Sequence, residues 1–206
     1  MAQAPSKRPS KVILLIAVFA GLLVGLLRSR LQHQAWQLPE LRHVWLVVVA
    51  FIPQLLIFYL PGWRDQIPES AVSAGLVTSQ LGLLVFCLLN WKYNGILVLA
   101  GGLALNLFVI VVNGGFMPLS TETAAQLMSQ RFLDTLKVGS PLGAGSKDIL
   151  LAPQQIIFPW LADRFVIPAG FLYRFAFSIG DVFIGLGAFL LLSLQPNYLE
   201  RQRSRC

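Results

Sequence analysis

The sequence predicts an all-α membrane protein with five transmembrane helices and a long, partly helical interfacial loop between the fourth and fifth. Hydrophobic residues make up 56% of the chain and charged residues 12%, and mean hydropathy is +0.69, a balance unlike that of soluble domains. Most of the apolar residues fall into five runs, which lie at 12–27, 44–60, 71–89, 95–112 and 176–194.

Aromatic residues support these boundaries independently of hydropathy. All nine tryptophan and tyrosine residues lie at or just outside the ends of the runs, where amphipathic rings sit at a bilayer surface. These are Trp36, Trp45, Tyr59, Trp63, Trp91, Tyr93, Trp160, Tyr173 and Tyr198.

The first run is expected to be an uncleaved membrane anchor. Arg28 and Arg30 follow it directly, and residues 28–32 contain no small-x-small cleavage site of the kind that signal peptides need. Gly21 and Gly25 form a Gly-x-x-x-Gly face, which favours close helix packing.

The next three runs carry their own packing signals. Pro53 lies near the centre of the second run and should bend that helix. Ala71, Gly75 and Ser79 form a stripe of small residues on the third. Residues 90–94 leave room only for a tight hairpin, so the third and fourth helices should be antiparallel neighbours.

Residues 113–175 contain no run long enough to cross a bilayer. Within them, 120–136 places Ala125, Met128, Phe132 and Leu136 on one face of an amphipathic helix, and Ser120 is a suitable N-cap. The apolar stretches 156–159 and 165–175 are interrupted by prolines and charges, so we expect them to lie along the membrane interface.

The resulting organisation has five parts and an orientation. Short segments on the side of the carboxy terminus carry seven basic residues against four on the other side, although basic residues near the ends of the long loop make the numbers equal. Long loops translocate with little regard to charge, so we expect a cytoplasmic carboxy terminus in the bacterial inner membrane. The parts are a basic extension (1–11), a four-helix transmembrane region (12–112), an extracytoplasmic loop with an amphipathic helix (113–175), a fifth helix (176–195) and a basic tail (196–206).

Two motifs carry a family resemblance. The turn Asn113-Gly114-Gly115-Phe116-Met117-Pro118 and the segment Ser178-Ile179-Gly180-Asp181-Val182 resemble those of a bacterial family of small multi-span membrane proteins whose members carry a domain of unknown function. Gly21, Gly25 and Arg28, together with 134–136 and 148–153, fit the same pattern, whereas Ser146-Lys147 replaces an expected glycine. The resemblance implies a membrane location and no known activity.

Asp181 is the one acid within any of the runs. An ionisable group at membrane depth suggests function, because a charge is costly in hydrocarbon. The structural alternative is a capping box, since Ser178 and Asp181 have the Ser-x-x-Asp spacing of a helix start.

Helix geometry predicts a polar cluster around this acid. At 1.5 Å per residue Asp181 lies about 7 Å and Asn106 about 9 Å inside the same membrane face. Asn113 follows Asn106 on nearly the same helical face, and Gln54 lies in the same half of the second helix. The cluster of Gln54, Asn106, Asn113 and Asp181 serves either as hydrogen-bonding glue between helices or as a solute site.

The glycine turn has two readings as well. Gly114 and Gly115 are typical of a helix carboxy-terminal cap, and Pro118 after Met117 prevents the helix from continuing. The functional alternative is a backbone nest for an anion or a lipid headgroup.

The sequence offers no catalytic, cofactor or metal constellation. His33 and His43 flank a loop outside ligand spacing, and Cys87 and Cys206 fit neither a disulfide framework nor a metal pair. Intramembrane proteolysis would need a second acid or an activated serine. We therefore expect a protein without enzymatic activity, metal or cofactor.

Two functions are expected from these features. The first is an accessory or assembly subunit of a larger membrane complex, with the lipid bilayer and other membrane subunits as partners and no role for nucleic acid, because the net charge of +7 gathers at the ends of apolar runs. The alternative is a small solute-binding permease component that uses the cluster around Asp181.

Overall fold

The computed structural model describes residues 10–33, 36–37, 39–60, 64–143, 146–167 and 174–194. In this part of the chain there are seven α-helices, two short 3-10 helices and two two-stranded sheets. The protein is mostly helical, but the expectation of an all-α fold is wrong. Trp63, Tyr173, most of the basic extension and the tail with Tyr198 and Cys206 lie outside the described residues.

Five long helices form the main body, which we call the bundle. Four agree with the predicted runs to within a few residues, whereas the last begins at Ile179 because Ala176 and Phe177 belong to a strand. The helices are α1 (Ser10–Leu31), α2 (Trp45–Tyr59), α3 (Glu69–Leu89), α4 (Ile96–Val112) and α7 (Ile179–Ser193).

Length separates these helices into two groups. Val12–Leu31 of α1 and Glu69–Leu89 are long and apolar enough to cross a membrane by length and composition. Helices α2, α4 and α7 are equally apolar in character but have 15, 17 and 15 residues. The length criterion thus supports two candidate spans rather than the five expected.

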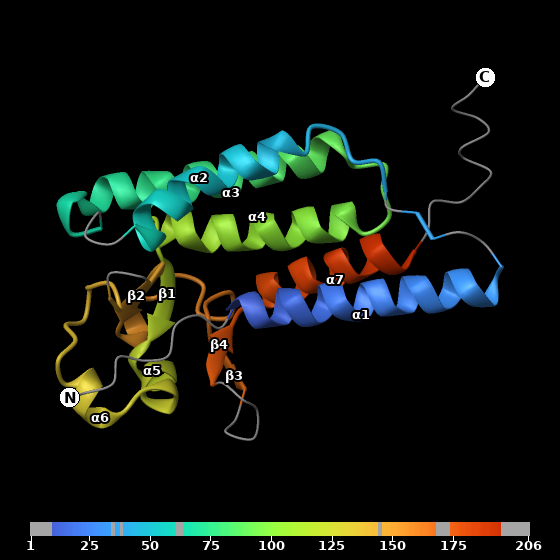
Figure 1. Cartoon of the computed structure of the whole chain (residues 1–206). Helices are drawn as coiled ribbons and strands as arrows, with labels where there is room; N and C mark the ends of the chain where they lie inside the picture. The colour runs from blue at the N-terminus through green and yellow to red at the C-terminus, as the bar shows by residue number, and fades with distance from the viewer. Residues whose placement is uncertain are drawn as a thin grey trace.

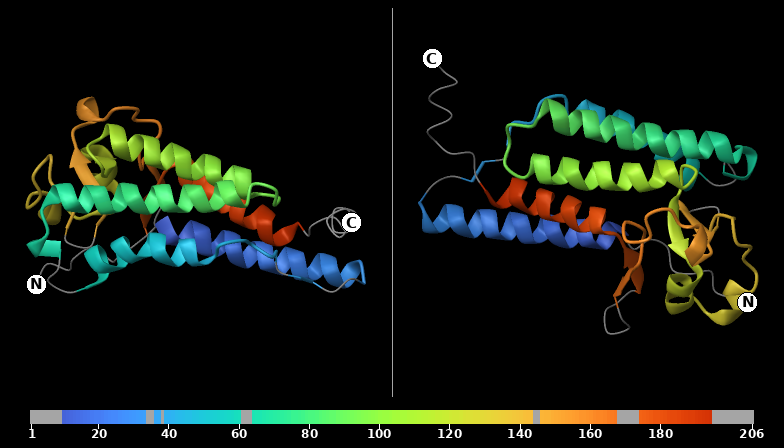
Figure 2. Two further views of the ribbon diagram at one scale, coloured as in Figure 1. Left: turned by 90° about the horizontal axis from the view of Figure 1, so that it is seen from above. Right: turned by 180° about the vertical axis from the view of Figure 1, so that it is seen from behind.

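The order of the helices in space differs from their order in the chain. Helix α1 packs against α7, α7 against α4, α4 against α3 and α3 against α2 (Figures 1 and 2). The predicted hairpin of neighbouring α3 and α4 is present. The last helix therefore lies between the first and the fourth.

Small residues allow these helices to approach closely. A Cβ atom on Gly21 would lie 3.0 Å from the carbonyl oxygen of Phe189 in α7, and Gly25 faces Leu192 of the same helix. On α3, Gly75 faces Ile57 of α2, and the Ser79 hydroxyl donates to the Ala50 carbonyl at 2.5 Å. Both predicted stripes therefore have partners within the chain, although Ala71 is exposed.

The long loop folds into a compact unit at one end of the bundle, which we call the cap (described residues 116–177; Figure 1). Its small core contains Leu119, Ala124, Leu142, Leu150 and Ala176. Its elements are β1 (Met117–Ser120), α5 (Thr121–Leu127), α6 (Gln130–Leu133), β2 (Asp148–Leu151), a 3-10 turn (Pro153–Gln155), β3 (Phe165–Ile167) and β4 (Phe175–Phe177). A second 3-10 turn, Arg64–Gln66, precedes α3.

Two short ladders hold the cap together. Strand β1 pairs in parallel with β2, aligning Met117 with Asp148, and β3 pairs antiparallel with β4. In the described part of the stretch 165–175, which we expect to lie along the interface, residues 165–167 pair with 175–177. Its location at an interface stays a prediction.

The predicted amphipathic helix over 120–136 is also wrong as a single element. Ser120 does cap α5, with the Thr123 amide donating to its hydroxyl at 3.0 Å. The helix ends at Leu127, because Met128 takes an extended conformation before α6 begins. Ala124 rather than Ala125 faces the core.

Two neighbouring glycines of α4 provide a matched test of the contact with α7. A Cβ atom on Gly102 would lie 2.5 Å from the Gly180 carbonyl oxygen and 2.7 Å from the Ile184 nitrogen, whereas Gly101 has open space. We expect Gly102→Ala to destabilise the protein by about 1–3 kcal/mol, since backbone atoms cannot move aside. Gly101→Ala should be neutral or stabilise by up to about 1 kcal/mol. Thermal denaturation of the purified variants measures both, and equal melting temperatures would contradict the packing.

Candidate functional site at the junction of bundle and cap

Asp181 lies in the first turn of α7, where the predicted capping box is present. The Asp181 amide donates to the Ser178 hydroxyl, and the Ser178 amide donates to Oδ2 of Asp181, each at 3.1 Å. Ser178 is fully buried and Asp181 is 9% exposed. The local reading of this acid as a helix cap is therefore correct.

Asn106 of α4 joins the same group. Its Nδ2 donates to Oδ1 of Asp181 at 3.0 Å, and the Ser178 hydroxyl donates to its Oδ1 at 2.9 Å. Gly180 makes the approach possible, because any side chain there would collide with the Asn106 amide. Asn106, Ser178 and Asp181 thus form a closed, buried triad in which both carboxylate oxygens of Asp181 have donors.

The other two members of the predicted cluster lie elsewhere. Asn113 ends α4 and holds the cap in place, since its Nδ2 donates to the Ile157 carbonyl and its Oδ1 accepts from the Ile157 amide, both at 2.9 Å. Gln54 is half-buried on α2, which packs on α3, and no hydrogen bond among the described residues joins it to Asp181. The four-residue cluster is therefore reduced to Asn106 and Asp181, with Ser178 added.

The glycine turn ends α4 and leads into the cap. Gly114 and Gly115 have φ angles of +81° and +88°, which glycine adopts readily. Their amides donate to the carbonyls of Val111 and Ile110, as in helix carboxy-terminal caps. Met117 and Pro118 follow in β1, both buried. Because both glycine amides have partners in the chain, they are not available to a bound anion.

Three further ionisable residues, which the sequence analysis did not single out, lie beside this turn. The Met117 amide donates to the Lys147 carbonyl at 3.1 Å, and the Asp163 amide donates to the Pro118 carbonyl at 3.3 Å. Asp148 begins β2, opposite Met117. Asp163 is 4% exposed, while Lys147 and Asp148 are half-buried.

These residues and Asp181 form one electrostatic unit, which we call the junction cluster (Lys147, Asp148, Asp163 and Asp181). Burial alone would lower the pKa of Lys147, but the carboxylates of Asp163, Asp181 and Asp148 outweigh it, and the pKa is raised. The lysine therefore stays charged. Three carboxyl groups from β2, the 163 loop and α7 share this single ammonium group.

The two carboxyl groups of the cap are strongly perturbed. Burial raises the pKa of Asp163 well above its ordinary range, Lys147 acts in the opposite direction, and Asp148 and Asp181 raise the pKa further. Burial also raises the pKa of Asp148, against the effect of Lys147 and of a hydrogen bond from Ser146. Oδ1 of Asp148 and Oδ1 of Asp163 are buried without a hydrogen-bond partner.

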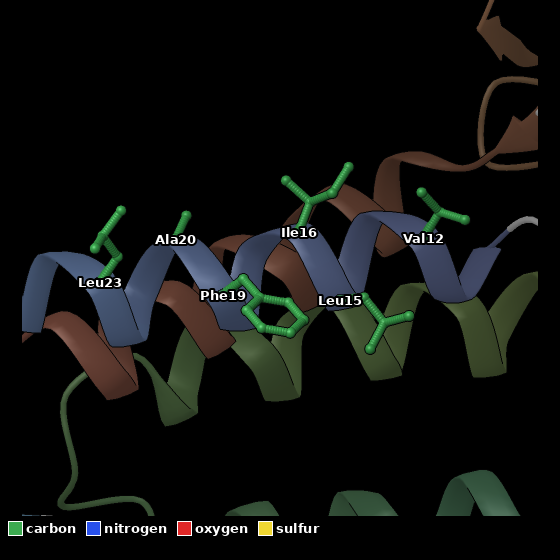
Figure 3. A pocket seen from close by; sticks show the side chains of 6 residues that line it. All are labelled: Val12, Leu15, Ile16, Phe19, Ala20 and Leu23. Atoms are coloured by element: carbon green, nitrogen blue, oxygen red, sulfur yellow. The ribbon is translucent and has the colours of Figure 1, made fainter. Parts of the chain in front are cut away.

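Other surfaces of the described residues lack this chemistry. No group of three His, Cys, Asp or Glu side chains in this part of the chain is arranged to hold a metal ion. A shallow depression of about 490 Å³ lies along α1, lined by Val12, Leu15, Ile16, Phe19, Ala20 and Leu23. Their side chains project away from α7 (Figure 3). This surface suits hydrocarbon rather than a polar solute.

Comparison with known proteins identifies the family. The model of a family described as "Family of unknown function (DUF5317)" matches residues 39–193. The chain belongs to this family. The match spans α2 to α7 and thus the whole junction cluster. An uncharacterized protein of Thermotoga maritima is 27% identical over 195 residues, which cover 94% of this chain and 95% of that protein. No solved structure matches the chain.

The raised pKa of Asp163 predicts a pH-dependent stability. Its carboxyl group is protonated in the folded protein above the pH at which it ionises in the unfolded chain, so its contribution to stability falls as pH rises above about 4. Lys147 lowers the pKa of Asp163, whereas Asp148 and Asp181 raise it, so these neighbours determine the pH range over which stability falls. We therefore expect Asp163→Asn to be more stable than the wild type at about pH 8, and this difference to shrink toward about pH 5.

Asp134→Asn is the matched control, because Asp134 is an exposed acid of the same cap. Its melting temperature should follow that of the wild type at every pH. Thermal denaturation across this range measures all three proteins. A constant difference between Asp163→Asn and the wild type would contradict the assignment of a perturbed carboxyl group.

Proposed function

We propose that this protein is a multi-pass protein of the bacterial inner membrane, with all five bundle helices in the bilayer and the cap outside it. The order of packing supports this proposal. Helices α7 and α4 lie between α1 and α3, the two helices long enough to span. A bilayer that takes up α1 and α3 must therefore also take up α7 and α4, and α2 packs against α3 as a fifth apolar helix.

The surface of the bundle agrees with a lipid environment. Ile16 and Phe19 of α1 are 58% and 71% exposed, and an apolar face of this kind is unfavourable in water. Exposed aromatic residues mark both ends of the bundle, with Trp45 and Trp91 at one end and Tyr59 and Trp160 at the other. Such rings anchor a protein at the two interfaces of a bilayer.

The basic residues support a cap on the extracytoplasmic side. Four exposed basic residues lie at the bundle end opposite the cap (Figure 1). Arg28 and Arg30 are in the last turn of α1, Arg42 precedes α2, and Lys92 lies between α3 and α4. Positive charge in short segments favours the cytoplasmic side. The carboxy terminus then lies in the cytoplasm.

We further propose that the protein is a solute-binding component of a permease, without enzymatic activity. One observation carries this proposal: buried carboxylate oxygens of Asp148 and Asp163 lack partners beside the hydrogen-bonded triad of Asp181. Buried polar groups in native proteins are normally satisfied. Exceptions that gather where several elements meet favour a ligand site.

An accessory or assembly role has less support. The small-residue faces that led us to expect partner subunits contact α7 and α2 within the chain. The outward apolar faces suit lipid equally well. Native electrophoresis of mildly solubilised membranes distinguishes the two functions, because a stable complex with unrelated subunits would restore the accessory role.

Solute binding can be tested with Asp181→Asn. Asparagine keeps a similar shape but removes one of the negative charges that attract a solute to the junction cluster, so we expect solute uptake into proteoliposomes to fall about tenfold or more, which corresponds to about 1.4 kcal/mol. Asp134→Asn should transport normally. Normal uptake by Asp181→Asn, or the absence of any solute that stabilises the wild type, would contradict the proposal.

The orientation predicts a labelling pattern. Lys137 lies in the cap and Lys92 at the opposite end, and both are exposed. In a background with Cys87→Ser and Cys206→Ser, a membrane-impermeant maleimide should label Lys137→Cys in intact spheroplasts. It should label Lys92→Cys only after permeabilisation, and the reverse pattern would exclude an extracytoplasmic cap.

A further inference from the structure

We propose that the junction cluster binds a small ligand through a primary ammonium group placed between the carboxylates of Asp148 and Asp163. This inference rests on the proposed solute-binding function and names its substrate class. It follows from three properties of the cluster, which are its charge, its unpartnered atoms and its lack of a group of ligands suited to a metal ion.

The charge of the cluster favours a cation. Asp148, Asp163 and Asp181 face the single ammonium group of Lys147, so two negative charges remain uncompensated when all three acids ionise. Asp181 already accepts hydrogen bonds from Asn106 and from the Ser178 amide. The carboxylates with an unpartnered oxygen are therefore those of the two acids of the cap, and their negative charge would repel an anionic ligand.

The unpartnered atoms specify a hydrogen-bond donor. Oδ1 of Asp148 and Oδ1 of Asp163 are buried acceptors without donors, while Oδ2 of Asp148 accepts from the Ser146 hydroxyl at 3.0 Å. A primary ammonium group has three N–H donors and a positive charge, and charge-assisted bonds of this kind are the strongest available to a carboxylate. Since Asp163 is 96% buried, the bound group must be small.

The number of available ligands favours an ammonium group over a metal ion. Calcium requires six to eight oxygen ligands at about 2.3–2.6 Å, and the described residues contain no group of three suitable side chains so arranged. An ammonium group needs only one acceptor for each N–H, at about 2.8 Å. The unpartnered Oδ1 atoms of Asp148 and Asp163 offer two such acceptors.

Binding at this site competes with protons. Burial raises the pKa of Asp148 and of Asp163, Lys147 acts in the opposite direction and Asp181 in the same direction, so protons compete for both carboxyl groups in the empty site. The ligand requires their ionised forms. Its affinity therefore increases with pH, and binding releases protons to the solution.

The inference is tested by titrating purified full-length protein in detergent with methylammonium, tetramethylammonium or acetate. We expect methylammonium to raise the melting temperature and to bind about tenfold more tightly at about pH 8 than at about pH 6. Tetramethylammonium has the same charge but no N–H donor, so it should have no effect, and acetate should have none. A weakly buffered indicator should record proton release on binding.

Variants locate the site. Asp163→Asn and Asp148→Asn should each weaken methylammonium binding about tenfold or more, whereas Asp134→Asn should not change it. If either variant fails to fold, the other and the comparison of the two ammonium ions still decide the question. Equal responses to the two ions, or unchanged binding by both variants, would overturn the inference.

The outcomes separate this inference from the function on which it rests. Stabilisation only by neutral or anionic solutes, lost in Asp181→Asn, would support solute binding and overturn the ammonium class. A screen in which no solute of any charge stabilises the wild type would overturn both.

Discussion

The close contact of α7 with α4 is the constraint on which the rest of the structure depends. Gly102 and Gly180 allow the two backbones to approach so far that Asn106 reaches Asp181 across them. The same helix accepts α1 along Gly21 and Gly25. Helix α7 is thereby fixed between α1 and α4, and the start of α7 lies at the junction of the bundle with the cap.

The position of the cap depends on α4 and α7, because hydrogen bonds attach it to the end of α4 and to the start of α7. Asn113 at the end of α4 binds the backbone of Ile157, and Ser178 at the end of β4 caps α7. Residues 117–118 then bring Lys147 and Asp163 beside Asp181 through backbone hydrogen bonds. Ionisable groups from distant parts of the chain are thus brought together in partly or fully buried positions, where burial and the neighbouring charges shift the pKa values of Lys147, Asp148 and Asp163.

Sequence reasoning succeeded where the signal is local. The long helices, the capping box at Ser178 and the glycine turn after α4 each depend on residues within a few positions of one another. The pair of Asn106 and Asp181 was also reached, because depth in a helix follows from counting residues. Gln54 was misplaced, since the same counting does not tell which helix lies beside which. The strands of the cap were missed because β1 pairs with β2 some 30 residues later in the chain.

The sequence by itself determined which segments are apolar helices, the bounds of four of them to within a few residues, and that a lone acid lies near the start of the last one. These properties are local, because hydrophobic periodicity, caps and turns act over a few residues. Only the tertiary structure decided the order of the helices, the folded state of the long loop and which residues lie next to Asp181. Lys147, Asp148 and Asp163 are ordinary loop residues in the sequence, and they become one cluster because pairing and packing between distant segments bring them together.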